Sequence, residues 1–406
     1  MKILLSAFAF APNVGSEPGV GWRWALELAR HHEVTVMTDV SRQILVEANG
    51  VQLPPNVRVA YFRPVWLRSI PLNSNTAQLL YTAWQFSLLN FARGLQREHG
   101  FDLALHCTYS VFRHPSFLGF LGIPFVFGPL GGGEDGPMVL KRSINLREKI
   151  KELLRSVVNK AALFDPFLWL AYSRATLILV STAQTRNALP WPFRERAVVY
   201  PNLGVDAIPD AKPSAHIDGE PLHLVFVGRL LGWKGVHFAI RALAVAIKSG
   251  VNVELSIIGS GPYEKSLRIL AERQGVAQSI QWLGQRPQAE VFALYRSMHG
   301  FIFPSLHDSG GTVVLEAQAH GLPVICLDLG GPATLVTPDT AIVISTKGCD
   351  EAAVVDGLAN AIGVLAINEN RRMEMAWSAI MHANSMSWEK RVLGVLQLVE
   401  GIQHGR

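Results

Sequence analysis

The sequence of 406 residues has few cysteines, few charged residues and no long uninterrupted hydrophobic run. Its three cysteines, Cys107, Cys326 and Cys349, are far apart, which excludes a disulfide framework and a zinc site built from paired cysteines. We therefore expect a reducing, cytoplasmic setting. Charged residues interrupt the longest apolar stretch, residues 162–183, so no membrane-spanning segment is expected.

Only 17% of the residues are charged, whereas 49% are hydrophobic. This balance excludes a disordered chain, and the length predicts two folded domains because a single core rarely grows so large. The net charge of +5 favours anionic partners such as nucleotides, phosphates or lipid headgroups. We do not expect nucleic acid among them, since the basic residues are not interleaved with stacking aromatic residues in a recognisable module.

The N-terminal stretch MKILLSAFAFAP admits two interpretations. An apolar run that ends in small residues is typical of a secretory signal, but Lys2 is its only basic residue and the run is short. A buried strand of a parallel sheet gives the same pattern. We favour the strand.

Short runs rich in Val, Ile, Leu and Phe alternate with longer helical patterns in both halves of the chain. The runs lie at residues 2–8, 33–38, 101–107, 124–129 and 176–182, and again at 222–228, 253–259, 279–284, 300–305 and 323–328. Such alternation predicts an α/β protein with two Rossmann-like, doubly wound domains.

The expected domains are divided by a segment rich in Pro, Gly and Asp. They are an N-terminal domain at 1–205, a linker at 206–220, a second domain at 221–375, and a C-terminal helix or helix pair at 376–406 that packs back across both. Ligands of such sheets bind beyond the carboxyl ends of the strands, so the cleft between the domains is the expected site.

The segment PSLHDSGGTVVLEAQAHGLPVI, residues 304–325, places two acidic residues around a glycine turn. Gly310 and Gly311 permit close backbone approach, and a helix that begins near Thr312 offers free N–H donors that suit a phosphate. Glu316, about one turn into the helix, is placed to accept hydrogen bonds from a ribose diol, and Asp308 to bind a sugar beyond the phosphate. A solvated loop and a carboxylate that favours the helix N-terminus are the alternative for either acid alone.

Two cations flank a second glycine-containing loop, in VFVGRLLGWKG. Arg229 and Lys234 follow a predicted strand and are suited to neutralise a diphosphate, Arg through its planar fork and Lys as a point charge. A surface charge is the alternative for each residue alone.

Taken together, these motifs resemble those of nucleotide-sugar glycosyltransferases of the GT-B fold, in the large retaining group called family four. That family carries G-R-L-x-x-x-K-G, a G-x-G-P turn, and an acidic pair separated by seven residues and followed by A-x-A-x-G-x-P-V-I. GRLLGWKG, IIGSGP and the 304–325 segment match in the same order, after PNLGVD in the linker, and span most of residues 200–325. One departure is Asp308, where the family usually has Glu, and the shorter side chain bears on which donor sugar fits.

The resemblance implies a role for each matching residue. Arg229 and Lys234 would bind the donor diphosphate and Glu316 the ribose, while Asp308 would address the sugar hydroxyls as a catalytic residue. The backbone of Gly310, Gly311 and Thr312 would hold phosphate or sugar, and the loop around Gln285 and Arg286 would lie near the base.

The N-terminal half resembles the family less closely. GSEPGVGWRWALELARHHEVTVMT is similar to the glycine-rich first loop and helix of one subset, in which Gly19 and Gly21 would approach the donor phosphates and Glu17 would face sugar or acceptor. That subset places a His after the FDL strand and a glycine run after the next strand. His106 is therefore a catalytic candidate, with Glu134 second, and a core histidine bonded by its neighbours is an equal alternative for His106.

The activity implied by the resemblance is transfer of a sugar from a nucleotide-diphosphate donor to a glycan or lipid-linked acceptor, with retention, in bacterial-type polysaccharide or glycolipid assembly. The chain has no Asp-x-Asp motif, so we predict no metal and no cofactor besides the donor substrate. A nucleotide-sugar epimerase or hydrolase on the same scaffold and a non-catalytic sugar-nucleotide binding protein are the alternatives. NAD chemistry is disfavoured because the glycines of the first half do not directly follow the first strand.

Residues 141–164 form a basic amphipathic pattern, with apolar residues at helical spacing and seven Lys or Arg against two Glu. Such a helix suits an anionic membrane surface, where the protein would be peripheral on the inner face and its acceptor lipid-linked. The apolar side could instead cover the first sheet, and we favour that packing. Residues 76–96 pose the same choice.

Overall fold

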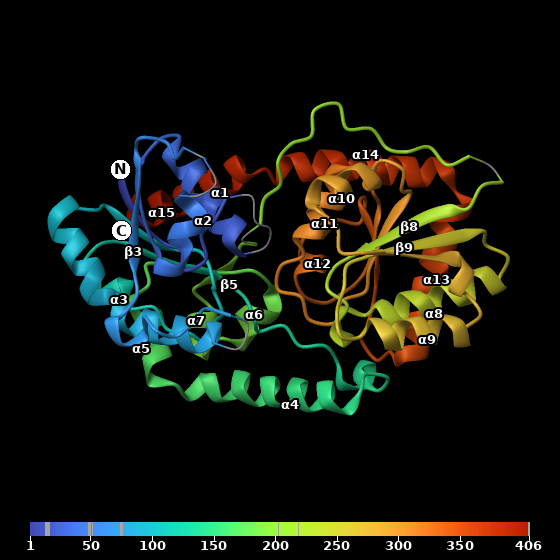
Figure 1. The fold of residues 1–406 in the computed structure, drawn as a ribbon, viewed down its shortest axis with the longest axis horizontal. Coiled ribbons are helices and arrows are strands. Elements are labelled where there is room, and N and C mark those ends of the chain that lie inside the picture. Colours follow the sequence, from blue (N-terminus) through green and yellow to red (C-terminus); the bar gives the residue numbers. More distant parts are fainter. Residues whose placement is uncertain are drawn as a thin grey trace. The chain divides into compact units, whose positions relative to one another are not determined.

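A computed structural model gives the fold and describes residues 1–12, 17–47, 50, 52–73, 76–201, 203–217 and 219–404. The chain forms two compact units, each an α/β domain around one parallel sheet (Figure 1). The first unit comprises Met1–Gly133, Val157–Leu203 and Trp388–Arg406, and the second Glu134–Ser156 and Gly204–Ser387.

The sheet of the first unit has seven strands in the described residues, in the order β3-β2-β1-β4-β5-β6-β7. They are β1 (Lys2–Ser6), β2 (Glu33–Asp39), β3 (Val57–Phe62), β4 (Leu103–His106), β5 (Phe125–Leu130), β6 (Leu177–Val180) and β7 (Ala197–Val199). The helices are α1 (Glu17–Ala29), α2 (Gln43–Glu47), α3 (Ala77–His99), α5 (Pro166–Arg174), α6 (Ala183–Ala188), α7 (Trp191–Arg194) and α15 (Trp388–His404). Helix α3 lies on the sheet through Tyr81, Trp84 and Leu88, which are all buried.

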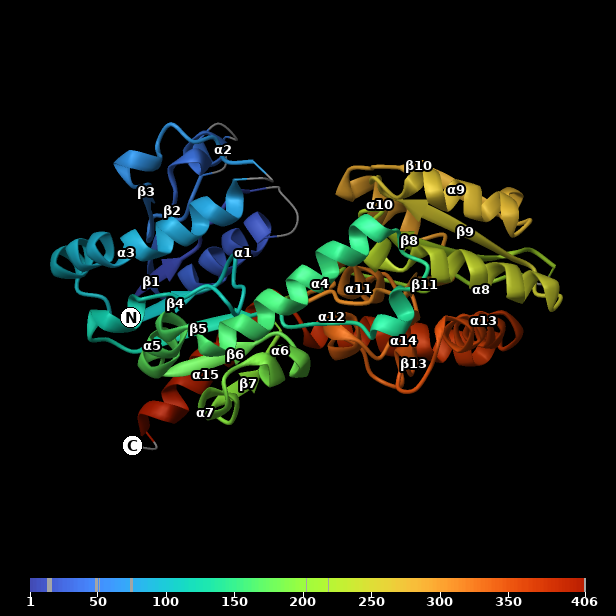
Figure 2. The same ribbon diagram turned by 90° about the horizontal axis from the view of Figure 1, so that it is seen from below.

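The second unit repeats this plan with six strands in the described residues, in the order β10-β9-β8-β11-β12-β13. They are β8 (Leu222–Val227), β9 (Val253–Ile258), β10 (Ile280–Gly284), β11 (Gly300–Phe303), β12 (Val324–Leu327) and β13 (Ala341–Ile344). The helices are α8 (Val236–Lys248), α9 (Glu264–Arg273), α10 (Gln288–Tyr295), α11 (Thr312–Ala319), α12 (Gly330–Thr334), α13 (Glu351–Ile367) and α14 (Glu369–Ser385). Helix α8 packs against α13, and α11 against α14 (Figure 2).

Every strand predicted from an apolar run is present, including the N-terminal run, which is the buried strand β1. The edge strands β3 and β13 and the short strand β7 were not predicted. Each has partly exposed positions. The run of β3 is interrupted by Arg58, whereas β13 and β7 are apolar but only four and three residues long. The α/β class with two doubly wound sheets is confirmed.

The division of the chain differs from the expected one in one place. Residues 134–156, expected in the N-terminal domain, belong to the second unit. Of the C-terminal helices, α14 belongs to the second unit and α15 packs on α1 in the first. Residues 134–156 join the second unit because their side chains bond to loops of the second sheet.

The preference for packing α4 (Leu146–Ala161) against the first sheet is wrong. Its apolar residues are exposed, whereas the aromatic helix α3 buries its own apolar side. Across the described ranges no single helix is long and apolar enough to cross a bilayer, and α13 with α14 meets that test only as a pair bent by 101°.

Candidate functional site

The strand order of the second unit locates its candidate site. Strand β8 pairs with β9 on one side and with β11 on the other, so the chain leaves neighbouring strands in opposite directions. In doubly wound sheets this switch point opens a crevice at the carboxyl ends of the strands. The loops after β8 and β11 flank it, and they contain the motif residues Arg229, Lys234 and Asp308.

Glycines let the loops at this edge approach each other closely. Gly235 has a φ of +74°, and a Cβ there would lie 1.9 Å from the carbonyl oxygen of Pro304. A Cβ on Gly331, at the start of α12, would lie 1.9 Å from the carbonyl oxygen of Gly310. The Gly-Gly-Pro after β12 is therefore a part of the site that the sequence reasoning missed, although a glycine pair shortly after a buried strand was a visible signal.

We expect Gly235→Ala to destabilise the second unit by about 3 kcal/mol, because left-handed backbone strain adds to a collision with a backbone oxygen that cannot rotate away. Gly250→Ala is the matched control, since Gly250 also has a positive φ, +87°, but a Cβ there would have no atom within 4 Å. The control should cost about 1 kcal/mol. Urea unfolding of both variants measures the difference, and equal losses would show that the close approach is unimportant.

Lys234 and Asp308, the first acid of the motif set, form an ion pair in the structure. Lys234 Nζ donates to Asp308 Oδ2, and the side chains are only 14% and 16% exposed. Lys234 Nζ also lies 4.6 Å from the centre of the Trp233 ring and 5.0 Å from that of Phe303. The ammonium group is thus held at the ends of β8 and β11, where its charge acts in a partly desolvated environment.

Arg229 is exposed and makes no side-chain hydrogen bond or ion pair with any residue that the structure describes. It follows Gly228, directly after β8, so its guanidinium is available to a ligand. On the other loop, Gly311 has a φ of +107° and helix α11 begins at Thr312. The glycine turn and the helix start predicted at Gly310 to Thr312 are therefore present, and anion binding there stays a prediction.

The second acid, Glu316, lies on α11 and is partly buried. The side-chain amide of Gln288 donates to its Oε1 at 2.8 Å. Burial raises the pKa of Glu316, and this hydrogen bond opposes the rise. Gln288 starts α10, shortly after the loop predicted to lie near the base, and Arg286 in that loop pairs with Glu290. The roles predicted for Arg286 and Glu316 stay predictions.

Residues 134–156 contribute carboxylates to the same loops. The Ser309 hydroxyl donates to Glu134, which is fully buried, and the guanidinium of Arg155 donates to the Glu134 carbonyl. Glu134, a catalytic candidate, therefore lies beside the Asp308 loop. The backbone N–H of Gly232, in the Lys234 loop, donates to Glu148 Oε2 at 3.1 Å.

A buried ionic cluster contacts the Asp308 loop at His307, the residue before Asp308. Glu152 accepts from His307 Nε2 and from Lys141 Nζ, each at 2.9 Å, and Lys141 also donates to Asp135 at 2.7 Å. Burial alone would raise the pKa of Glu152, but the hydrogen bonds and charges of His307 and Lys141 lower it to about 2. The His307 ring stacks on Trp233 at 4.3 Å, so the neighbours of Asp308 and Lys234 are fixed against each other.

In the first unit, His106 ends β4 and is 1% exposed. Tyr81 Oη lies 3.1 Å from its Nε2, and Gln85 Nε2 lies 3.4 Å from its Nδ1. Burial lowers the pKa of His106 to about 3, so the ring is neutral. These contacts favour a core histidine, and a catalytic role stays a prediction.

The glycine-rich helix of the first unit has a packing role. A Cβ on Gly21 would lie 2.4 Å from the Ala9 carbonyl oxygen, so α1 can cross the end of β1 only because a glycine is present. Glu17 Oε2 accepts from the backbone N–H of Tyr109 at 2.9 Å. The structure therefore brings Glu17 to the carboxyl end of β4, and contact of Glu17, Gly19 and Gly21 with a donor stays a prediction.

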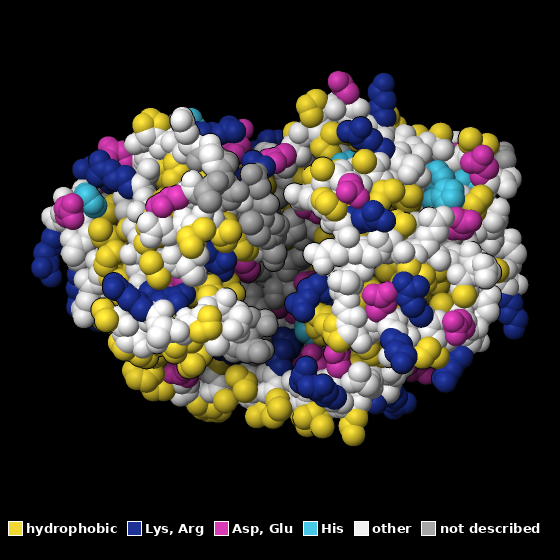
Figure 3. Space-filling view, in the orientation of Figure 1, with side chains coloured by type: hydrophobic (Ala, Val, Ile, Leu, Met, Phe, Trp, Pro, Cys, Tyr) yellow, Lys and Arg dark blue, Asp and Glu magenta, His cyan; other side chains and the backbone are white. Residues whose placement is uncertain are grey.

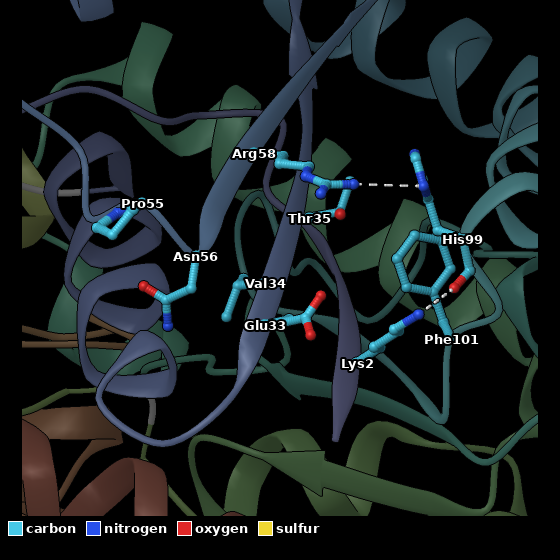
Figure 4. A pocket seen from close by; sticks show the side chains of 9 residues that line it. All are labelled: Lys2, Glu33, Val34, Thr35, Pro55, Asn56, Arg58, His99 and Phe101. Carbon is cyan, nitrogen blue, oxygen red and sulfur yellow. Dashed lines mark hydrogen bonds between the residues drawn. The ribbon is translucent and has the colours of Figure 1, made fainter.

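A hollow of about 470 Å³ in the first unit is not a good candidate site. It lies at the amino ends of β1 to β3, opposite the edge where ligands of such sheets bind (Figure 4). Its basic groups are engaged with His99, since Lys2 Nζ donates to the His99 carbonyl and Arg58 Nη1 lies 3.5 Å from His99 Nδ1. In the described part of the chain, no group of three or more His, Cys, Asp or Glu is arranged to hold a metal ion.

Comparison with known proteins finds a family match within the second unit. Residues 208–375 match the family described as glycosyl transferases group 1. A D-inositol 3-phosphate glycosyltransferase of Corynebacterium glutamicum is 34% identical over 180 residues, which cover 42% of each chain. One from Nocardia farcinica is 31% identical over 186 residues, 44% of this chain and 40% of the relative. The chain thus spans about two fifths of the length of these curated relatives.

Solved structures resemble the whole chain. Sucrose-phosphate synthase from Thermosynechococcus elongatus has a TM-score of 0.65 at 19% identity, covering 100% of both chains. HepE of Anabaena in complex with UDP has a TM-score of 0.64 at 17% identity, covering 98% of this chain and 99% of that one. Identities this low show the fold alone. Together with the ordered motifs, these matches show that residues 208–375 are similar to the glycosyl transferases group 1 family, in a chain with the GT-B fold.

Proposed function

We propose that this protein transfers a sugar from a nucleoside-diphosphate donor to a glycan or lipid-linked acceptor. The observation that carries the proposal is the pairing of Lys234 with Asp308 at the switch point of the second sheet, between Arg229 and the N-terminus of α11. Two cations and a helix N-terminus suit a diphosphate, while Glu316 and Asp308 suit the hydroxyls on either side of it. The similarity to HepE, whose structures contain UDP and UDP-glucose, supports UDP as the nucleotide.

The proposed chemistry proceeds with retention and without a metal. Departure of the diphosphate leaves negative charge on its oxygens, and preorganised cations stabilise that charge without a proton carrier. Lys234 would exchange Asp308 for the diphosphate when the donor binds, which frees the carboxylate of Asp308 for the sugar. The donor's own phosphate oxygen would take the acceptor proton, so the mechanism needs no general base from the protein. Retention rests on the family resemblance.

Calorimetric titration with UDP, GDP, ADP, CDP and NAD tests the donor site. We expect saturable binding of one diphosphate, UDP, with the same affinity in EDTA. Glu316→Ala should weaken it at least tenfold, because the ribose hydroxyls lose a charged acceptor. Glu272→Ala, at an exposed glutamate of α9 in the same unit, is the control and should bind as the parent protein does. Tight NAD binding with no diphosphate response would contradict the proposal.

Product analysis separates transfer from its alternatives. Nucleotide released together with a glycosylated acceptor supports transfer, whereas free nucleotide with free sugar, or an epimerised donor, would indicate a hydrolase or an epimerase. Donor binding without turnover on any acceptor would indicate a non-catalytic binding protein. NAD chemistry has little support. Asp39, at the end of β2, is the acid that would have to bind the ribose of NAD, but it is buried and paired with Arg63.

We further propose polysaccharide or glycolipid assembly at the cytoplasmic face of a membrane as the setting. None of the three cysteines forms a disulfide in the described structure, which fits a reducing compartment. The exposed apolar surface of α4 supports a peripheral position.

A further inference from the structure

Helix α4 has an apolar stripe that is not buried in the fold. Ile150, Leu153, Leu154, Val157 and Val158 recur at helical spacing on one side of the helix, and each is at least 50% exposed. The yellow side chains along the lower edge of Figure 3 follow the course of α4 in Figure 1. A contiguous apolar surface of this kind marks an interaction site in a folded protein.

The two acidic residues of α4 lie on the opposite side of the helix and are both engaged in the second unit. Glu148 accepts from the Gly232 N–H, and Glu152 accepts from His307 and Lys141. Neither carboxylate is therefore presented with the apolar stripe, although both lie within the same helical turns.

Cations border the stripe instead. Arg147 and Lys151 lie along one side of it, and Lys149 and Lys160 along the other, as their spacing from the apolar residues requires. Arg147, Lys151 and Lys160 are exposed. The surface that α4 offers to a partner is thus apolar in the middle, positive at both borders and free of acids from α4.

The stripe continues into aromatic residues after α4. Phe164 is 85% exposed, and with Trp169, Leu170 and Phe193 it lines an open hollow of about 550 Å³ beside α5. Aromatic and aliphatic side chains at a surface are suited to enter the boundary between headgroups and acyl chains. We define the apolar stripe of α4 together with Phe164, Trp169 and Leu170 as the α4–α5 face.

We propose that the α4–α5 face docks on the surface of an anionic lipid bilayer. An acyl boundary matches the apolar centre and the aromatic hollow, and anionic headgroups match the cations at the borders. A protein partner would require its own complementary acidic rim, whereas a bilayer supplies that charge along the whole length of the helix. Docking on a bilayer rests on the proposed function in one respect. If the protein is a glycosyltransferase, its acceptor is then a lipid-linked sugar.

Helix α4 also joins this surface to the donor site. Its inward side bonds the Lys234 loop through Glu148 and the Asp308 loop through Glu152. A bilayer under α4 would therefore place the donor-binding loops at a fixed height above the headgroups, which suits an acceptor whose sugar projects from the membrane.

Flotation on a density gradient tests the docking in the absence of any sugar or nucleotide. The probe is a vesicle of phosphatidylcholine with a quarter phosphatidylglycerol, compared with phosphatidylcholine alone. We expect the full chain to float with the anionic vesicles at about 50 mM salt, and to float less at about 500 mM because screening weakens the contact with the headgroups. It should float weakly with the neutral vesicles.

Two double variants identify the surface. Leu153→Glu with Val157→Glu should lower partitioning at least tenfold, and Lys151→Gln with Lys160→Gln should lower it about tenfold on anionic vesicles only. Ile367→Glu is the control for the first, because Ile367 is an 82% exposed residue at the end of α13. Lys265→Gln with Lys347→Gln is the control for the second, since both residues are exposed lysines of the second unit. UDP affinity, measured in parallel, should be unchanged in all four.

Three results would overturn the proposal. The first is a parent protein that stays at the bottom of the gradient with anionic vesicles at low salt. The second is a Leu153→Glu, Val157→Glu variant that floats as the parent does. The third is a dimer in sedimentation equilibrium that the same variant dissociates, because a second copy would then cover the face. Loss of UDP binding alone would contradict the proposed function and leave the docking result standing.

Discussion

Replacing Lys234 with Met should lower the rate of sugar transfer by about 100- to 1000-fold. The variant loses the ammonium group that neutralises the leaving diphosphate, and a preorganised charge in a partly buried site commonly contributes that much. It also leaves Asp308, with a side chain only 16% exposed, without its partner. Met preserves most of the apolar stem, which packs near Trp233 and Phe303.

Steady-state kinetics with a UDP-sugar measures this effect, and Lys265→Met, at an exposed lysine of α9, is the matched control. Thermal unfolding of both variants shows whether the fold is kept. A Lys234→Met enzyme that unfolds like the parent and transfers sugar within threefold of its rate would remove Lys234 from the catalytic machinery. The same rate loss in the control would point to a nonspecific charge effect.

Glu152→Leu should destabilise the second unit by about 3 to 5 kcal/mol. Among the described residues, the substitution leaves Lys141, whose side chain is 1% exposed, with Asp135 as its one remaining ion-pair partner, and it removes the acceptor of His307. Removing one member of a buried ion pair costs this much because the remaining charge stays desolvated. Urea unfolding monitored by tryptophan fluorescence measures the change, and Glu272→Leu, on the surface of α9, should change it little.

The same carboxylate predicts a pH dependence. The pKa of Glu152 is lowered from 4.5 to about 2 in the folded state, so the folded protein binds fewer protons than the unfolded chain between those values. Its contribution to stability is therefore fully present above about pH 4.5 and is lost as the pH falls toward 2. Glu152→Gln should flatten this part of the stability curve. An unchanged slope between pH 5 and 3 would contradict the role of the cluster.

The sheets and the motif residues could be predicted from the sequence because both depend on local pattern. A strand covered by helices on both faces is apolar throughout, so β1 and β8 were recognisable as continuous runs. Lys234, Asp308 and Glu316 follow such runs at fixed spacing, and the carboxyl ends of neighbouring parallel strands meet at one edge.

The sequence could not predict where residues 134–156 belong. Glu134, Lys141 and Glu152 follow a strand of the first sheet in the chain, and only their contacts with Ser309 and His307 assign them to the second. Those partners lie 175 and 155 residues away in the sequence, and no local pattern encodes a pairing at that separation. The supporting cluster behind Asp308 was missed for this reason.

By itself the sequence determined the α/β class, the positions of the buried strands along the chain and the motif residues of the loops after β8 and β11, because periodicity and motif spacing are properties of neighbouring residues. Only the tertiary structure decided which amphipathic helix is covered. α3 and α4 both have an apolar side, yet α3 buries Tyr81 and Trp84 while α4 leaves Leu153 and Leu154 exposed. The physical reason is that an apolar side predicts that a helix will pack against some apolar surface. Which surface lies beside the helix depends on the rest of the fold.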